Sequence, residues 1–158
     1  MKIEPYTAAH RDAVVDLSLR AWAPVFASLK RVLHPPVYQD FYPEGWQKSQ
    51  EKSVSDTCAS AEMTTWVATE SGGPVGFVAV KMHSETFGEI YMIAVDPDYQ
   101  RRGIASRLTE FALDWMKKKG VSVAMVDTGG DEGHGPARAT YEKAGFGLLP
   151  VARYFKKL

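Results

Sequence analysis

The chain has 158 residues, 45% of them hydrophobic, and its 19 basic side chains balance its 19 acidic ones. This size and apolar content exclude disorder, and the zero net charge excludes an overall field that would recruit nucleic acid or an anionic membrane. The single cysteine, Cys58, excludes an internal disulfide, and the charged N-terminus contains neither a signal peptide nor an apolar span, so we expect one soluble, cytoplasmic domain over residues 1–158.

The first sixty residues predict a strand and two helices. Residues 2–6 are expected to form the strand, and Thr7 is placed to cap a helix whose apolar residues fall on one stripe. Pro24 is expected to end this helix. Residues 34–60 are irregular and rich in aromatic side chains, with a second helix over residues 47–58. The stripe of the first helix consists of Ala13, Val14, Leu17, Ala21 and Trp22.

The middle of the chain predicts four strands and a helix. Residues 64–69 and 75–80 form a β-hairpin around the turn Ser71-Gly72-Gly73-Pro74. Residues 89–95 are apolar on both faces, which predicts a strand that is covered on both sides and central in its sheet. A helix with one apolar face follows, and a right-handed crossover makes the next strand, residues 121–126, parallel to it. The apolar face of the helix consists of Ile104, Leu108, Phe111, Ala112 and Trp115.

The C-terminal residues predict one more helix and a last strand. Pro136 suits the first turn of the helix, and Gly145 suits its C-terminal cap. Residues 146–155 then return as a strand. The whole chain is expected to form a mixed sheet with helices on both faces.

The turn between residues 95 and 104 is suited to phosphate. The first N–H groups of the helix that follows have no partner within it and carry the positive end of its dipole. Arg101 and Arg102 add positive charge, and Gly103 lacks the Cβ that would keep an anion away from the backbone. The turn is therefore predicted to bind an anion.

Two motifs resemble those of the GNAT superfamily of acyl-CoA N-acyltransferases. The sequence Gln100-Arg101-Arg102-Gly103-Ile104-Ala105 matches the pyrophosphate motif Gln/Arg-x-x-Gly-x-Gly/Ala, and residues 137–146 resemble the family's fourth motif. In order and spacing the resemblance covers residues 63–158. It implies an α/β fold, a single GNAT-like domain with a central mixed sheet of six to seven strands flanked by about four helices.

The resemblance also implies the activity, which is transfer of an acetyl group from acetyl-CoA to a primary amine by direct attack in a ternary complex. Ile93 matches the backbone donor that stabilises the carbonyl oxygen, and the same strand would bind the pantetheine arm. We expect acetyl-CoA to contact Ile93, Ala94, Val95, Gln100, Arg101, Arg102, Gly103, Ile104, Ala105, Ser106, His134, Arg138 and Tyr141.

Two residues are candidates for proton transfer. Glu89 matches the family's glutamate base, four residues before Ile93, although it could equally be a solvated charge at a strand end. Tyr141, in the pattern Tyr-x-x-x-Gly-Phe, is expected to assist the departing thiolate, and the alternative is a tyrosine of the core. Other candidates for the base are Asp96, Asp98, Glu85 and a mechanism without a base.

The segment 127–134 is rich in glycine and ends at His134, where the family often has an asparagine that contacts pantetheine. An imidazole could keep that contact, and we do not expect it to be catalytic. The spacing of its carboxylates and histidine fits no metal template, so no metal is expected. A mobile loop near the cofactor is predicted instead.

Two other classes of function are consistent with the sequence. One is a non-catalytic acyl-CoA-binding or regulatory domain of the same fold, and the other is a nucleotide- or phosphosugar-binding module. The sequence does not identify the acceptor amine, and it leaves a homodimer open. By resemblance the acceptor side includes aromatic residues that are otherwise expected in the core, namely Trp22, Phe26, Tyr38, Phe41, Tyr42 and Trp46.

Overall fold

The computed structural model describes residues 1–70 and 72–158 of the chain. Within these residues five strands form one mixed sheet, in the order in which they occur along the chain. The first four strands are antiparallel to their neighbours, and the fifth is parallel to the fourth. The strands are β1 (Lys2–Pro5), β2 (Met63–Glu70), β3 (Gly73–Met82), β4 (Phe87–Val95) and β5 (Val123–Val126).

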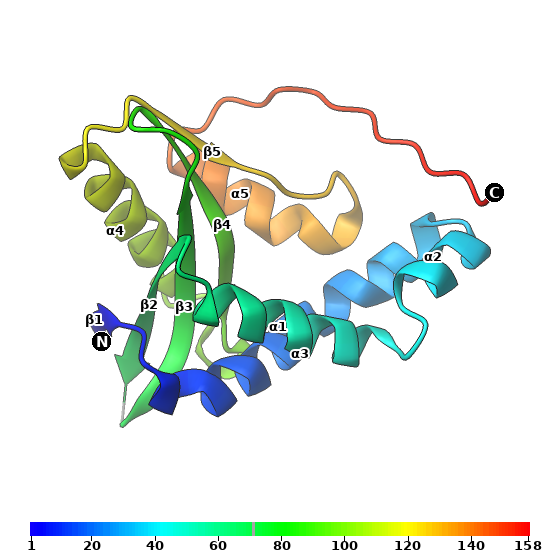
Figure 1. Cartoon of the computed structure of the whole chain (residues 1–158), viewed down its shortest axis with the longest axis horizontal. Coiled ribbons are helices and arrows are strands. Elements are labelled where there is room, and N and C mark those ends of the chain that lie inside the picture. The colour runs from blue at the N-terminus through cyan, green and yellow to red at the C-terminus, as the bar shows by residue number, and fades with distance from the viewer. Residues whose placement is uncertain (71) are drawn as a thin grey trace.

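Helices cover both faces of this sheet (Figure 1). One core lies under α4 and includes Leu108, and the other lies under α1 and α3 and includes Leu17. The helices of the described residues are α1 (Arg11–Val32), α2 (Pro35–Phe41), α3 (Trp46–Ala59), α4 (Ile104–Lys118) and α5 (Gly135–Lys143), with short 3-10 turns at Ala8–His10, Pro97–Tyr99 and Glu132–His134.

A bulge in β4 decides which of its residues face which core. The register with β3 shifts so that Tyr91 is an extra residue of β4. Ile90, before the bulge, packs in the core under α4, whereas Met92 and Ala94, after it, pack in the core under α1. A bulge of this kind bends a strand and redirects its side chains. Both faces of β4 are covered, as its sequence predicts.

The parallel pair of β4 and β5 is the crossover that the sequence predicts. The hairpin of β2 and β3 is also as expected, although Ser71 of its turn lies outside the described residues. Gly145 follows α5 with a φ of 88°, the left-handed conformation of a helix C-terminus.

Two helical predictions in the N-terminal half are wrong. Pro24 does not end α1, which continues to Val32. A proline inside a helix costs one backbone hydrogen bond, and packing on this half of α1 compensates for it, since the Phe26 ring stacks on Trp46 with 4.6 Å between centroids. The region expected to be irregular contains α2, which two prolines begin at its first turn, a position where proline has no hydrogen bond to lose.

The aromatic residues of this region pack mainly on one another. Tyr42 lies edge-on to Phe26, with centroids 5.2 Å apart, and Tyr38 lies 4.9 Å from Tyr42. Together with the Phe26–Trp46 stack they form a core between α1, α2 and α3. This packing agrees with the core alternative, and the acceptor-side role stays a prediction.

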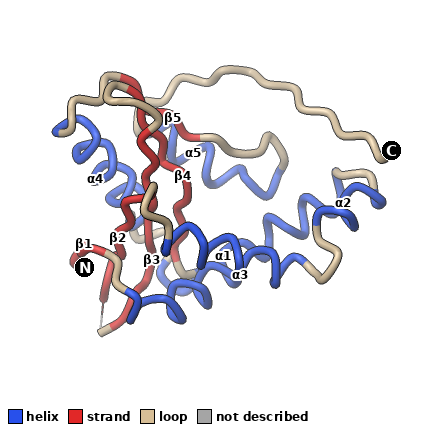
Figure 2. Tube along the Cα trace, viewed as in Figure 1, coloured by secondary structure: helices blue, strands red, loops and turns tan. Residues whose placement is uncertain are grey.

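The predicted last strand is absent from the described residues. The tail from Phe146 to Leu158 is an extended loop that passes α5 and ends beside α2 (Figure 2). There Phe155 packs against Phe41, with centroids 5.1 Å apart, and Lys157 pairs with Asp40. An apolar segment makes a strand only where a neighbouring strand accepts it. The sheet of the described residues thus has five strands rather than six or seven.

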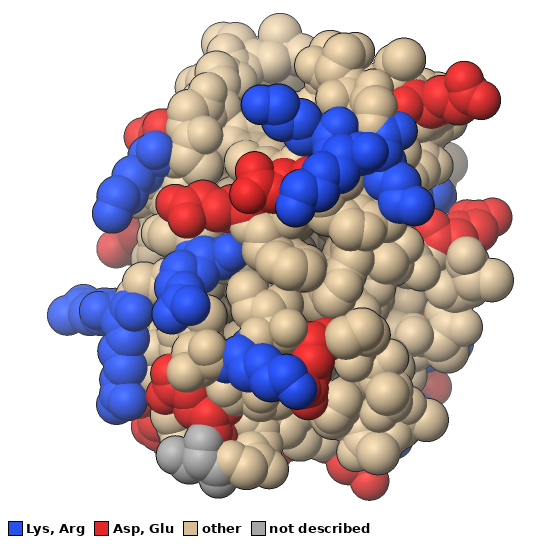
Figure 3. All heavy atoms as spheres, turned by 90° about the vertical axis from the view of Figure 1, so that its left-hand side faces the viewer, with Lys and Arg blue, Asp and Glu red and all other residues tan. Residues whose placement is uncertain are grey.

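Charges of both signs lie next to one another on the face that includes α4 (Figure 3), as the zero net charge implies. No helix in the part of the chain that the structure describes is both long enough and apolar enough to cross a membrane.

Candidate active site

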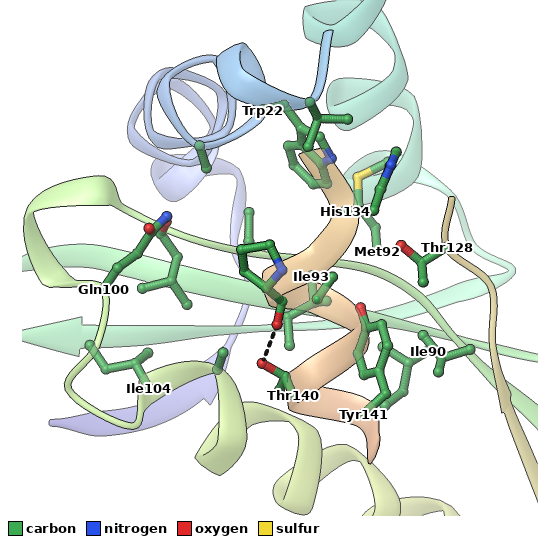
Figure 4. A pocket seen from close by; sticks show the side chains of 18 of the residues that line it. Trp22, Ile90, Met92, Ile93, Gln100, Ile104, Thr128, His134, Thr140 and Tyr141 are labelled. Carbon is green, nitrogen blue, oxygen red and sulfur yellow. Dashed lines mark hydrogen bonds between the residues drawn. The ribbon is translucent and has the colours of Figure 1, made fainter. Parts of the chain in front are cut away.

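A cavity of about 680 Å³ lies where β4 and β5 separate. The two strands pair as far as Ile90 and Val126, where β5 ends, and β4 continues to Val95. Residues of β4, of the turn that leads into α4, of α1 and of α5 line the space left between the strands (Figure 4).

The backbone of β4 turns hydrogen-bond donors toward this space. The Asp96 N–H donates to the Val75 carbonyl of β3 at 2.9 Å. Successive residues of a strand point their N–H groups to opposite sides. The N–H of Ala94 therefore faces β3, and those of Ile93 and Val95 face the open side. Gln100 agrees with this assignment, since its side-chain amide donates to the Val95 carbonyl at 3.0 Å. The N–H groups of Ile93 and Val95 therefore point into the gap beside β5.

The turn before α4 forms the second wall of the cavity. Arg101 has a φ of 60° and Gly103 one of 78°, so the chain passes twice through the left-handed region. The helix begins at Ile104, and the N–H groups of its first turn have no carbonyl partner within the helix. Together with the helix dipole and Arg101, which lines the cavity, they favour a bound anion.

Not every predicted anion contact faces the cavity. Arg102 does not line it, because its guanidinium donates to the Asp98 carbonyl at 2.9 Å and lies over the Tyr99 ring, 4.9 Å from its centroid. Gln100, Arg101, Gly103, Ile104, Ala105 and Ser106 do line it, as do Ile93, Ala94, Val95, His134 and Tyr141.

Tyr141 lies on α5 and closes the far end of the cavity. Its ring contacts Phe146 edge-on, and the residue is 8% exposed. Figure 4 shows the ring beside Ile90 with its hydroxyl turned into the pocket. Burial raises the pKa of this hydroxyl to about 12, so it keeps its proton at neutral pH and can donate it.

The segment 127–134 is held in place rather than left free. Asp131 accepts hydrogen bonds from the Ser28 hydroxyl of α1 at 2.5 Å, from the Gly133 N–H at 3.1 Å and from the ring of His134. Burial opposes the charge of Asp131, but these hydrogen bonds and the nearby imidazole prevail and lower its pKa. These hydrogen bonds tie the segment to α1, and the mobility expected from its sequence stays a prediction.

Arg138 also binds this segment. Its guanidinium donates to the Gly129 carbonyl at 2.6 Å and to the Asp131 carbonyl at 2.7 Å, and it does not line the cavity. These contacts are structural, and its expected contact with the cofactor stays a prediction.

The carboxylates considered as bases lie outside the cavity lining. Glu89 is hydrogen-bonded to His83, with 2.6 Å between Oε2 and Nε2, and its side chain is 13% exposed. Asp96 pairs with Arg20 of α1 at 2.5 Å and also accepts the Asp98 N–H. Asp96 thus joins α1 to the turn before α4.

Two features of the site were not predicted from the sequence. One is the bond between Asp131 and His134, although a carboxylate and a histidine three residues apart were visible in the sequence. The other is the bond from Ser28 to Asp131, which joins residues 103 positions apart and leaves no local signal. The aromatic side chain expected on the acceptor side that does line the cavity is Trp22.

Comparison with known proteins gives a consistent result. The model of the acetyltransferase (GNAT) family matches residues 35–146. The chain is 33% identical over 81 residues to mycothiol acetyltransferase of Thermomonospora curvata, a match that covers 51% of this chain and 27% of that protein. It is 35% identical over 66 residues to ribosomal protein bS18-alanine N-acetyltransferase of Escherichia coli K12, covering 42% and 43%. The chain thus spans less than half the length of these two curated relatives.

Among solved structures, the chain resembles PaiA N-acetyltransferase of Thermoplasma acidophilum, which was determined in complex with coenzyme A. The TM-score is 0.68 at 15% sequence identity, over 96% of this chain and 94% of that one. The likeness concerns the fold, and it agrees with the mixed α/β architecture expected from the sequence.

Proposed function

The chain belongs to the acetyltransferase (GNAT) family, and on this premise we propose that it transfers an acetyl group from acetyl-CoA to a primary amine. The amine attacks the thioester directly in a ternary complex. A reducing cytoplasm suits a chain with one cysteine, and burial raises the pKa of Cys58 to about 11, which leaves little reactive thiolate there.

One observation carries the proposal, which is that a single cavity joins the start of α4, the open edge of β4 and the hydroxyl of Tyr141. The unpaired N–H groups of Gly103, Ile104 and Ala105 suit a pyrophosphate. The backbone of Ile93 and Val95 suits the amides of a pantetheine arm, which can pair with it as a further strand would. The groups present therefore fit acetyl-CoA from its phosphates to its thioester.

Acetyl transfer requires stabilisation of charge on the thioester oxygen, a proton for the departing sulfur, and removal of a proton from the acceptor ammonium. The same residues supply the first two. The N–H of Ile93 is held in a strand, so it can stabilise charge on the thioester oxygen without reorganisation. Tyr141 keeps its proton at neutral pH and can give it to the departing sulfur. The third requirement is a group that takes a proton from the acceptor ammonium.

The acceptor class is inferred from the family and from the cavity. The names of the curated relatives point to mycothiol in one case and to the alanine of a ribosomal protein in the other. For this chain we propose a primary amine that enters between α1 and β4, beside Trp22 and Met92. This wall is apolar, so an acceptor with an apolar group next to its amine is favoured.

Calorimetry and a thiol-release assay test the proposal. We expect acetyl-CoA to bind and ATP and NAD not to compete with it, and we expect at least one of a panel of small amines, amino acids, aminoglycosides and peptides to release free CoA. Binding without thiol release from any acceptor would favour a non-catalytic acyl-CoA-binding domain. Competition by ATP or NAD would favour a nucleotide module.

Arg102→Ala should change acetyl-CoA affinity by only a few-fold. Its guanidinium is engaged by the Asp98 carbonyl and the Tyr99 ring, and the backbone donors of the turn remain in the variant. Titration calorimetry of the variant measures this. If Arg102→Ala lost as much affinity as we expect when a negative side chain is placed at Gly103, Arg102 would have to reorient to bind phosphate.

Glu89→Gln should lower the acyl-transfer rate a few-fold at neutral pH, and the loss should shrink as rising pH deprotonates the free amine. Glu89 does not line the cavity and is bonded to His83, so we propose that it acts through water and only as an auxiliary proton acceptor. Acyl-transfer rates of the parent and the variant, measured from pH 6 to pH 10, test this role of Glu89. A profile parallel to the parent's at every pH would make Glu89 a solvated charge, and a far larger loss would make it the main base.

A further inference from the structure

We propose that His134 takes the proton from the acceptor ammonium, and that Asp131 holds its imidazole in the tautomer which does so. The inference rests on the proposed acetyl transfer and adds a catalytic residue to it. It assigns His134 a role different from the pantetheine contact expected from the sequence.

The hydrogen bond between the Asp131 and His134 side chains determines the tautomer of the imidazole. Oδ1 of Asp131 lies within hydrogen-bond distance of Nδ1 of His134. A carboxylate can only accept, so Nδ1 carries the hydrogen and Nε2 keeps its lone pair. The other carboxylate oxygen accepts from Ser28 and from the Gly133 N–H, which fixes the carboxylate in turn.

The backbone packs closely around the His134 ring and the segment that carries it. A Cβ at Gly129 would lie 2.5 Å from Nδ1 of His134, so the backbone there closes over that edge of the ring. A Cβ at Gly133 would lie 2.6 Å from the Cβ of Ser28 and 3.0 Å from the Cα of Val25, so the segment sits directly on α1. These two glycines thus permit close packing, which is the opposite of a flexible loop. The histidine is held in one orientation before any substrate binds.

His134 is accessible to an acceptor in the cavity. His134 lines the cavity, and Figure 4 shows its ring near Trp22 and Met92, on the acceptor side. Asp127 also lines the cavity, but its side chain is 64% exposed and pairs with Arg153 at 3.5 Å. The other ionisable groups of the lining are arginines, which stay charged, and tyrosines, which are acids rather than bases. Among the described lining residues, His134 is therefore the suited base.

The proton balance is complete with the groups named. His134 Nε2 takes one proton from the ammonium and returns it to solvent after the reaction. The freed amine forms the C–N bond at the thioester carbon, and the C–S bond breaks with its electron pair on sulfur. The nitrogen loses its second proton as the amide forms, and this balances the proton that Tyr141 gives to the thiolate and regains.

His134→Asn is the decisive variant, because asparagine keeps a hydrogen-bonding group and removes the base. We expect kcat at neutral pH to fall by at least about tenfold, with the loss shrinking as pH rises and the acetyl-CoA Kd unchanged. Asp131→Asn should also lower kcat, because the carboxylate that fixes the Nδ1–H tautomer of His134 is lost. Other ionisable groups on the neighbouring elements are Arg138, which donates to the Asp131 carbonyl, Tyr141, which lines the same cavity, and Arg31 of α1, which pairs with Glu132.

Glu132→Gln is the matched control. It removes the same charge from the same segment, but its side chain is 92% exposed and pairs only with Arg31 among the described residues. We expect its rate and its pH profile to match the parent's.

Nitrogen-15 NMR of the free protein adds a test that needs no acceptor, and it should show His134 as the Nδ1–H tautomer. An Nε2–H tautomer, or an unchanged kcat in His134→Asn, would overturn the inference while acetyl transfer stands. A raised acetyl-CoA Kd with unchanged kcat in that variant would return His134 to the pantetheine contact. If no amine were acetylated by the parent protein, the proposed function would fail and the catalytic role with it.

Discussion

Replacing Gly103 with glutamate should weaken acetyl-CoA binding by on the order of a hundredfold or more, the largest effect on affinity that we expect. The variant places a negative side chain at the start of α4, where the unpaired N–H groups and the dipole favour an anion. Each charge-assisted hydrogen bond that is lost costs about 1.5–3 kcal/mol, and about 2.7 kcal/mol corresponds to a hundredfold change in Kd. Titration calorimetry with acetyl-CoA measures the change.

Gly103→Ala is the control for this variant. Both substitutions put a side chain at a φ of 78°, which costs about 1–2 kcal/mol of stability, and there is open space for a Cβ. Only glutamate adds charge and length. We expect the alanine variant to lose far less affinity than the glutamate variant at a similarly lowered melting temperature, because its Cβ crowds the anion but does not repel it. Equal Kd values for the parent and a folded Gly103→Glu would move the phosphates away from this turn.

The sequence predicted the parts of the fold that local rules decide. The hairpin of β2 and β3, the crossover from β4 to β5 and the start of α4 each follow from turn residues and apolar spacing over a few positions. Errors arose where long-range packing overrides local preference. Pro24 lies inside α1 because that helix packs against distant segments, and the tail after Phe146 has no strand beside it.

The candidate site likewise has parts that local sequence predicts and parts that depend on long-range contacts. The turn at Gly103 and the strand before it are continuous in sequence, so their contribution to the cavity was predictable. The roles of Arg102 and Arg138 were not, because whether an arginine faces a ligand or a backbone carbonyl depends on neighbours that no motif specifies. His134 shows how far local sequence can predict a site. Its Nδ1 partner, Asp131, is three residues away, but Asp131 is itself held by Ser28 of α1, which is distant in sequence.

Tyr141→Phe should lower kcat by about a hundredfold and leave the acetyl-CoA Kd nearly unchanged, because the ring stays and only the hydroxyl is lost. Burial raises the pKa of that hydroxyl to about 12, so the parent enzyme holds it protonated throughout the physiological range. A thiol has a pKa of about 8.5, so even a weak donor near the sulfur helps it to leave. Steady-state rates at saturating acetyl-CoA, paired with calorimetry, separate turnover from binding.

Tyr154→Phe removes the same hydroxyl from a residue of the tail that is 90% exposed, and it should leave both kcat and Kd at the parent's values. The contrast between the two variants depends on where the hydroxyl lies. If Tyr141→Phe turned over as fast as Tyr154→Phe at saturating acetyl-CoA, Tyr141 would be a core tyrosine packed against Phe146, and the thiolate would leave with a proton from solvent. A loss of affinity without a loss of turnover would instead place the hydroxyl on the cofactor arm, because only an interaction formed as the C–S bond breaks lowers kcat alone.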